Sequence, residues 1–304
     1  MSGTGATTVW STDELERVAD ALGRPIPGPG ALSGDWRRFW HLTFNVAYMN
    51  WKLRFFGSAL GYLWQLVRPL LLFLVLYVFF SLVARFGAHG GASNRYYSVQ
   101  LLVAIVLFTF FSEATSGAVR SVVANEALVR KIQFPRLAIP LSVVLLALFN
   151  LSLNMIVVIV FALIAGVRPM VTWLEAPAIV LLLVVLATGI ALLLSSLFVY
   201  LRDLEPIWEV TLQVIFYASP IIIPIATVRK YLSRTLVHVY MLNPLAVVFE
   251  QFKHAFVTHG APSAAALMGG TALSIAIPVV ICLATLGIGF HVFRRIAPRV
   301  AEDL

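Results

Sequence analysis

Six apolar segments, each long enough to cross a lipid bilayer as an α-helix, constrain this 304-residue chain more than any other feature. About 20 consecutive apolar residues in a helix span the hydrocarbon layer. Hydrophobic residues make up 60% of the chain and charged residues only 12%, too few to cover a water-soluble protein of this length. We therefore expect an all-α integral membrane protein with six transmembrane helices, at residues 66–85, 98–118, 139–166, 176–200, 206–224 and 272–293.

Composition divides the chain into three regions. Residues 1–33 are polar, and Ser11 followed by Glu14 predicts a short helix that begins with a capping box. Residues 34–65 mix aromatic residues with Arg and Lys, which is typical of an amphipathic helix that lies in the lipid headgroup layer. Residues 66–304 contain the six predicted spans.

The end of the fifth span and the segment after it predict a re-entrant structure. Pro220 and Pro224 should break the fifth helix before it has fully crossed. Further on, Asn243 suits a helix N-cap and Pro244 suits its first turn. The residues that follow at helical spacing form one apolar face: Leu245, Val248, Phe249, Phe252 and Phe256. We expect a helical hairpin near residues 225–260 that enters the outer leaflet from the extracytoplasmic side.

The basic residues predict the orientation of the chain. The net charge is +8, and with a cytoplasmic N-terminus most of the 22 Lys and Arg residues lie inside the cell. An even number of spans then places both termini in the cytoplasm, in a multi-pass protein of the inner (plasma) membrane. The positive charge is therefore explained by topology and by membrane lipids, and we expect no nucleic-acid partner. Cys282 is the only cysteine and the six histidines lack ligand spacing, so we expect no metal site.

A charged stretch, NEALVRKIQFPRLAIP at residues 125–140, separates the second and third spans. One interpretation is a solvated loop that Arg130, Lys131 and Arg136 anchor to anionic lipid. The other is a short cytoplasmic coupling helix that docks into a groove of a partner protein and transmits force. The spacing of these residues does not decide between the two.

Several separated motifs resemble one family. The stretch WKLRFFGSALGYLWQLVRPLL, residues 51–71, combines basic and aromatic residues with Leu-Gly-x-Leu-Trp and a proline that opens the first span. This pattern is similar to a signature of the ABC-2-type permeases that export polysaccharides, the Wzm/TagG family. The residues that carry it here are Lys52, Arg54, Leu60, Gly61, Leu63, Trp64 and Pro69. The charged stretch, then YLRDLEPIWEV, NPLAVVFEQFK and the final AEDL, resemble the same family in the same order, over residues 35–304.

The resemblance implies a half-transporter. Two copies of the permease would work with two copies of a separate ABC ATPase, which would hold ATP and Mg, while this chain would bind no cofactor. The cargo would be a lipid-linked polysaccharide, such as a cell-wall galactan, an O antigen or a teichoic-acid-like polymer. A phosphate-binding P-loop needs a Gly-Lys-Ser/Thr run, and no lysine follows a glycine in this chain, so we expect no ATPase or other enzyme here. The residues that would contact the ATPase are Glu126, Leu128, Arg130, Lys131, Ile132, Phe134, Pro135 and Arg136.

Further candidate residues lie at the ends and inside the spans. Arg202, Asp203 and Glu205 form either an ordinary helix boundary or a cytoplasmic ion-pair elbow near the coupling helix, and the resemblance favours the elbow. Glu113 falls within the second span, where we expect a structural hydrogen bond or a channel-facing polar group in preference to a proton relay. Aromatic residues of the first and fifth spans suit either a sugar path or contacts with lipid and other helices. They are Phe73, Tyr77, Phe79, Phe80, Trp208, Phe216 and Tyr217.

Two other functions remain open from the sequence. An ABC-2 exporter of a small amphiphile or drug would need only a lateral cleft, whereas a polymer needs an unbroken polar and aromatic path. A membrane glycosyltransferase or flippase that works without ATP would usually need paired acids that hold a metal-bound sugar nucleotide. The acids of RDLEPIWE, residues 202–209, do not have that spacing.

Overall fold

The computed structural model describes residues 36–55, 61–80, 96–126, 135–223, 225, 233–257, 263–268 and 272–303, and within these ranges it contains helices and turns but no strand. The helices, in chain order, are α2 (Trp36–Phe55), α3 (Gly61–Val78), α4 (Tyr97–Val119), α5 (Ser121–Ala124), α7 (Ala138–Ile164), the 3-10 helix η2 (Val171–Glu175), α8 (Ala176–Leu197), α9 (Leu204–Ala218), α11 (Arg234–Tyr240), α12 (Pro244–Phe256), α13 (Ala264–Leu267) and α14 (Ala272–Asp303). The predicted helix within residues 1–33 lies outside the described part of the chain.

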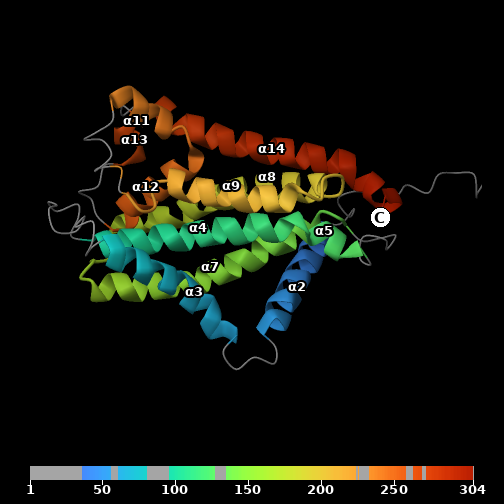
Figure 1. The fold of residues 1–304 in the computed structure, drawn as a ribbon, viewed down its shortest axis with the longest axis horizontal. Coiled ribbons are helices and arrows are strands. Elements are labelled where there is room, and N and C mark those ends of the chain that lie inside the picture. Colours follow the sequence, from blue (N-terminus) through green and yellow to red (C-terminus); the bar gives the residue numbers. More distant parts are fainter. Residues whose placement is uncertain are drawn as a thin grey trace, which may run out of the picture.

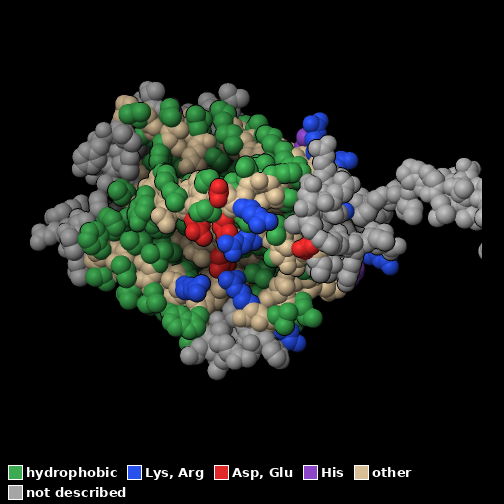
Figure 2. All heavy atoms as spheres, turned by 45° about the vertical axis from the view of Figure 1, so that its right-hand side comes forward, with side chains coloured by type: hydrophobic (Ala, Val, Ile, Leu, Met, Phe, Trp, Pro, Cys, Tyr) green, Lys and Arg blue, Asp and Glu red, His purple; other side chains and the backbone are tan. Residues whose placement is uncertain are grey.

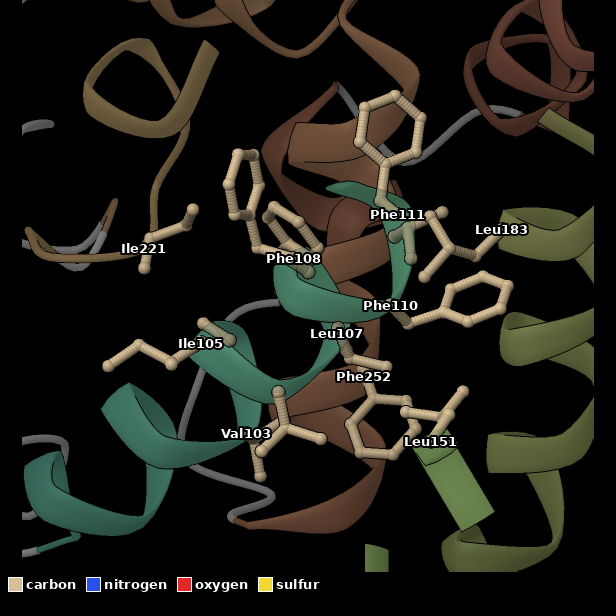
Figure 3. Close-up of a cluster of buried hydrophobic side chains, with 14 of the residues drawn as sticks. Val103, Ile105, Leu107, Phe108, Phe110, Phe111, Leu151, Leu183, Ile221 and Phe252 are labelled. Atoms are coloured by element: carbon tan, nitrogen blue, oxygen red, sulfur yellow. The ribbon is translucent and has the colours of Figure 1, made fainter. Parts of the chain in front are cut away.

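A bundle of long helices forms the body of the protein. Helices α4, α7, α8, α9 and α14 extend along one another, with α11, α12 and α13 at one end and α5 and the C-terminus at the other (Figure 1). We call these the α12 end and the α5 end. Because α4 is buried on nearly all sides, it forms the centre of the bundle. Its side chains meet Leu151 of α7, Leu183 of α8 and Phe252 of α12 (Figure 3).

Four described helices are long and apolar enough to cross a membrane: Tyr97–Val119, Ala138–Ile164, Val171–Leu197 and Ala276–Ile296. They correspond to the predicted second, third, fourth and sixth spans. The last of them belongs to α14, which continues ten residues beyond the predicted boundary at residue 293, to Asp303.

The first and fifth predicted spans differ from expectation. Helix α3 begins at Gly61 instead of residue 66, so Pro69 lies inside the helix and does not open it, and residues 81–95 are outside the described part. Helix α9 ends at Ala218, because Ser219 turns extended immediately before Pro220. Its 15 residues extend for roughly 22 Å, less than the ~30 Å of a hydrocarbon layer. The break expected at Pro220 is therefore confirmed, whereas Pro224 is not described.

Helix α2 packs along α7 and runs obliquely to the bundle (Figure 1). Phe39, Thr43 and Ala47 are buried on one face, while Phe44 and Trp51 make edge contacts with Phe149 of α7. Large aromatic side chains remain exposed on the rest of the helix: Trp36, Trp40, Phe44 and Tyr48. A helix is thus present over Trp36–Phe55 of the predicted segment 34–65, whereas residues 61–65 belong to α3; its position in the headgroup layer stays a prediction.

Helices α8 and α14 approach each other closely through glycines. A Cβ atom added to Gly189 would lie 2.6 Å from the backbone nitrogen of Leu286, and one added to Gly289 would collide with the carbonyl oxygen of Gly189. Only glycine allows two helix backbones to come this near, as in the small-residue contacts of membrane helices.

Candidate functional site

The α5 end of the bundle carries an ion pair between two helices. Arg120, directly after α4, donates through Nε to Glu205 Oε2 in the first turn of α9. The Arg120 side chain is 67% exposed and that of Glu205 only 23%, so the pair lies at the edge of the packed region. Figure 2 shows acidic and basic side chains side by side in a face that is otherwise largely apolar. Of the predicted elbow, Glu205 makes this bond, while Arg202 and Asp203 are exposed.

The predicted coupling stretch begins six residues after Arg120. Glu126 is partly buried and is the last residue described before a gap. The described chain begins again at Pro135. Leu128, Arg130, Lys131, Ile132 and Phe134 lie outside the described residues. Arg136 is only 7% exposed, which argues against direct lipid contact for this residue. The residues after Arg136 are buried: Leu137 and Ile139 pack with Phe39 of α2 and Phe293 of α14. The end of the stretch therefore belongs to a hydrophobic cluster between these helices.

A polar junction joins three helices inside the bundle. Gln65 Nε2 of α3 donates to Glu113 Oε1 at 2.7 Å, and Asn150 Nδ2 of α7 donates to Glu113 Oε2 at 2.9 Å. Asn154 Nδ2 donates in turn to the Asn150 carbonyl at 2.9 Å. Glu113 is partly buried. It lies roughly 9 Å along the axis of α4 from Val119, the last residue of that helix. Both carboxylate oxygens are therefore used in holding α3 and α7 against α4.

The candidate channel aromatics fall into two groups. Phe73 is buried and stacks on Tyr77 at 5.5 Å, Trp208 Nε1 donates to Thr115 Oγ1 at 3.1 Å, and Phe216 packs edge-on against Phe108. Phe80 is partly buried and contacts Phe79. Other large side chains of α3, of the residue directly after it and of α9 are exposed. They are positioned to contact a substrate, lipid or another chain: Leu71, Leu72, Leu74, Val75, Phe79, Ile207, Val210, Val214 and Tyr217.

At the α12 end, the predicted helix forms as expected locally. The Asn243 side chain accepts a hydrogen bond from the Leu245 backbone N–H at 3.0 Å, and Pro244 occupies the first turn. All five residues of the predicted apolar face are buried: Leu245, Val248, Phe249, Phe252 and Phe256. The C-terminal carbonyls are capped by η2, because Thr172 Oγ1 donates to Ala255 O at 2.7 Å and Trp173 Nε1 donates to Phe256 O at 2.8 Å.

Sequence reasoning missed a buried ion pair in α12. Lys253 Nζ lies 3.0 Å from Glu250 Oε1 and also donates to the Pro220 carbonyl, and both side chains are almost fully buried. Burial, together with the negative charge of Glu250, raises the pKa of the Tyr240 phenol above its ordinary value. The spacing held a signal: Lys253 follows Phe249 by four residues and precedes Phe256 by three, so a 3.6-residue period places its charge on the apolar face.

No group of three His, Cys, Asp or Glu side chains in the described ranges is arranged to hold a metal ion. In the described part of the chain, the arrangement consists of bonds between helices at both ends of the bundle and a polar junction within it.

Known proteins with similar sequences place this arrangement in a family. The family described as ABC-2 type transporter matches residues 42–257, which include α3 to α12 and the side-chain hydrogen bonds described above, but not α14 and its contacts. A protein from Klebsiella pneumoniae named O-antigen export system permease protein RfbA is 27% identical over 227 residues, 71% of this chain and 84% of that protein. A protein of the same name from Myxococcus xanthus is 27% identical over 236 residues, 77% of this chain and 87% of its own length. This chain belongs to the ABC-2 type transporter family, as a membrane permease.

Proposed function

We propose that this chain is the permease of an ATP-driven exporter that moves a lipid-linked polysaccharide across the inner membrane. The observation that carries the proposal is the similarity to permeases named for O-antigen export, which extends over 71–77% of the chain. Two copies of the chain work with two copies of a separate ABC ATPase, which binds the ATP and Mg.

In this proposal the α5 end faces the cytoplasm. The four long helices are joined by α3 as the first span and by α9, too short to cross alone, together with the turn at residues 219–222 as the fifth; both termini are cytoplasmic. Arg294 and Arg295 of α14 then lie on the inner side, in keeping with the positive-inside rule. Helices α11 and α12 form the re-entrant hairpin on the outer side.

Movement of the ATPase displaces the coupling stretch. Residues from Glu126 to Phe134 contact the ATPase, whereas Pro135 and Arg136 are buried, and the Arg120–Glu205 ion pair lies only six residues from the start of that stretch. Displacement of the loop therefore acts on the first turn of α9. Because α9 is a single short helix, a tilt at Glu205 also moves its other end near Ala218.

The path for the polymer follows the exposed faces of α3 and α9 where two copies of the permease meet. A polysaccharide offers apolar C–H faces to aromatic rings and hydroxyl groups to Tyr and Trp side chains. Tyr217 and Phe79 are exposed and have the chemistry to line such a path. The glycan is a cell-wall galactan, an O antigen or a teichoic-acid-like polymer.

Depletion of the permease in its own host tests the function. We expect lipid-linked polymer to accumulate on the cytoplasmic face of the membrane, where its sugars can be identified after extraction. Unchanged polymer export combined with loss of efflux of a small amphiphile would overturn the proposal in favour of that alternative. Polymer transport by the purified chain alone, without an ATPase, would also contradict it.

A further inference from the structure

Lys253, which is paired with Glu250 inside α12, joins that helix to the end of α9. The pair itself lies within one helix, with side chains 2% and 4% exposed, so it connects no elements. The connection comes from the bond of Lys253 Nζ to the Pro220 carbonyl, 33 residues away in sequence, in the turn that ends α9. Burying a charge is unfavourable unless it is paired and hydrogen-bonded, and here Glu250 provides the pairing.

The turn at Ser219–Ile222 is held from two sides. Its four residues are buried, and the Tyr97 hydroxyl of α4 donates to the Ile222 carbonyl at 3.1 Å. Lys253 holds the neighbouring Pro220 carbonyl from α12. An apolar residue at position 253 would fill the space but would have no donor for that carbonyl.

Helix α12 is itself fixed to the start of α8. Thr172 and Trp173 of η2 bind its last carbonyls, and the Trp173 ring stacks on Phe256 with centroids 4.3 Å apart. One side of α9, in contrast, presents Val210, Val214 and Tyr217 to the surroundings. Lys253 therefore connects α12, which is fixed to α8, with the end of α9, which is exposed on one side.

We propose that Lys253 is a positioning residue that latches the end of α9 to the hairpin and holds the exit at the α12 end closed at rest. Glu250 neutralises and orients the ammonium group. When α9 tilts at its Glu205 end, the Lys253–Pro220 bond must release, as must the Tyr97–Ile222 bond, before the turn can move. The inference rests on the proposed export function, in which the α12 end is the outer end.

A cysteine-labelling experiment in the full-length chain tests the latch. Cys282 is the only cysteine, so Cys282→Ala followed by Ile222→Cys gives a single reporter at a side chain that is buried in the turn. The reporter is exposed to a membrane-impermeant maleimide in intact cells, with and without the paired substitution Glu250→Leu and Lys253→Met. Both charges are removed together because a single substitution would leave one buried charge without its partner.

We expect the paired variant to fold, with a somewhat lower unfolding temperature because the buried Pro220 carbonyl loses its donor, and to label roughly tenfold faster, a factor that corresponds to about 1.4 kcal/mol. Ser219→Ala is the matched control in the same turn, because its hydroxyl has no hydrogen-bond partner among the described residues, and it should label at the parent rate. A folded paired variant with an unchanged labelling rate would overturn the latch. Loss of folding in the paired variant would also overturn it, since the pair would then serve stability alone. The labelling needs no substrate, so failure of glycan export in the parent would refute the proposed function without affecting this result.

Discussion

At the scale of single residues, several polar side chains of this protein join one helix to another. Glu113 accepts from Gln65 and Asn150, Glu205 accepts from Arg120, and Lys253 donates to the Pro220 carbonyl. Apolar packing between helices has little directional preference, whereas each of these bonds specifies a partner. We infer that they select one arrangement of helices that apolar contacts alone would leave loosely defined.

Substitution of Glu113 tests its structural role. Glu113→Leu removes the acceptor of two amide donors, so we expect the free energy of unfolding to fall by about 2–3 kcal/mol. Glu113→Gln retains one acceptor oxygen and should lose about half as much. Thermal unfolding in detergent, followed by tryptophan fluorescence, measures both. A Glu113→Gln variant with parental stability but no transport would support the proton-relay alternative instead.

At the scale of elements, α8 and α14 are in close backbone contact, whereas α9 is exposed along one side. The contact between α8 and α14 depends on Gly189 and Gly289. Helix α9 leaves Val210, Val214 and Tyr217 exposed. These two extremes predict different responses to substitution. Changes in the close pair should alter folding, and changes in α9 should alter activity.

Gly189→Ala tests the close contact. Its new methyl group would lie 2.6 Å from a backbone nitrogen of α14, which cannot move without shifting the helix. We expect a loss of about 1–3 kcal/mol or more in unfolding free energy, the range seen for overpacked cores. Gly287→Ala is the matched control, since a Cβ there meets nothing within 4 Å, and it should leave the unfolding temperature unchanged or slightly raised.

A charge exchange tests the ion pair at the start of α9. Arg120→Glu should leave folding intact, because exposed ion pairs contribute only about 0–1 kcal/mol, but it should reduce ATP-driven export. The exchange variant, Arg120→Glu with Glu205→Arg, should recover much of the activity. Export is measured in membrane vesicles that contain the ATPase. Equal inactivity of the single and exchange variants would show that pairing of the two charges is not what matters.

At the scale of the whole molecule, features that depend on local composition were predictable and those that depend on tertiary contacts were not. The apolar run at residues 98–118 became Tyr97–Val119 and that at 139–166 became Ala138–Ile164, because apolar length is a local property. Asn243 was predictable as a cap for the same reason. The burial of Lys253 depends on a carbonyl 33 residues away, and no local pattern identifies that partner.

The orientation of the whole molecule is testable with single cysteines in a Cys282→Ala background. Arg202 in the loop between α8 and α9 and His238 in α11 are both exposed, and they lie at opposite ends of the bundle. We expect an impermeant maleimide to label His238→Cys in intact cells and Arg202→Cys only in inside-out vesicles. Labelling of Arg202→Cys from outside the cell would reverse the proposed topology.

The glycine contact between α8 and α14 limits how this protein can change shape. Where two backbones touch, neither helix can rotate or slide past the other without steric collision, so the pair should behave as a stationary frame throughout a transport cycle. The helices expected to move are then α3 and α9. Both pack on α4, which in turn packs on α8. A cross-link between α8 and α14 should therefore be tolerated during turnover, whereas one that ties α9 to α4 should arrest it.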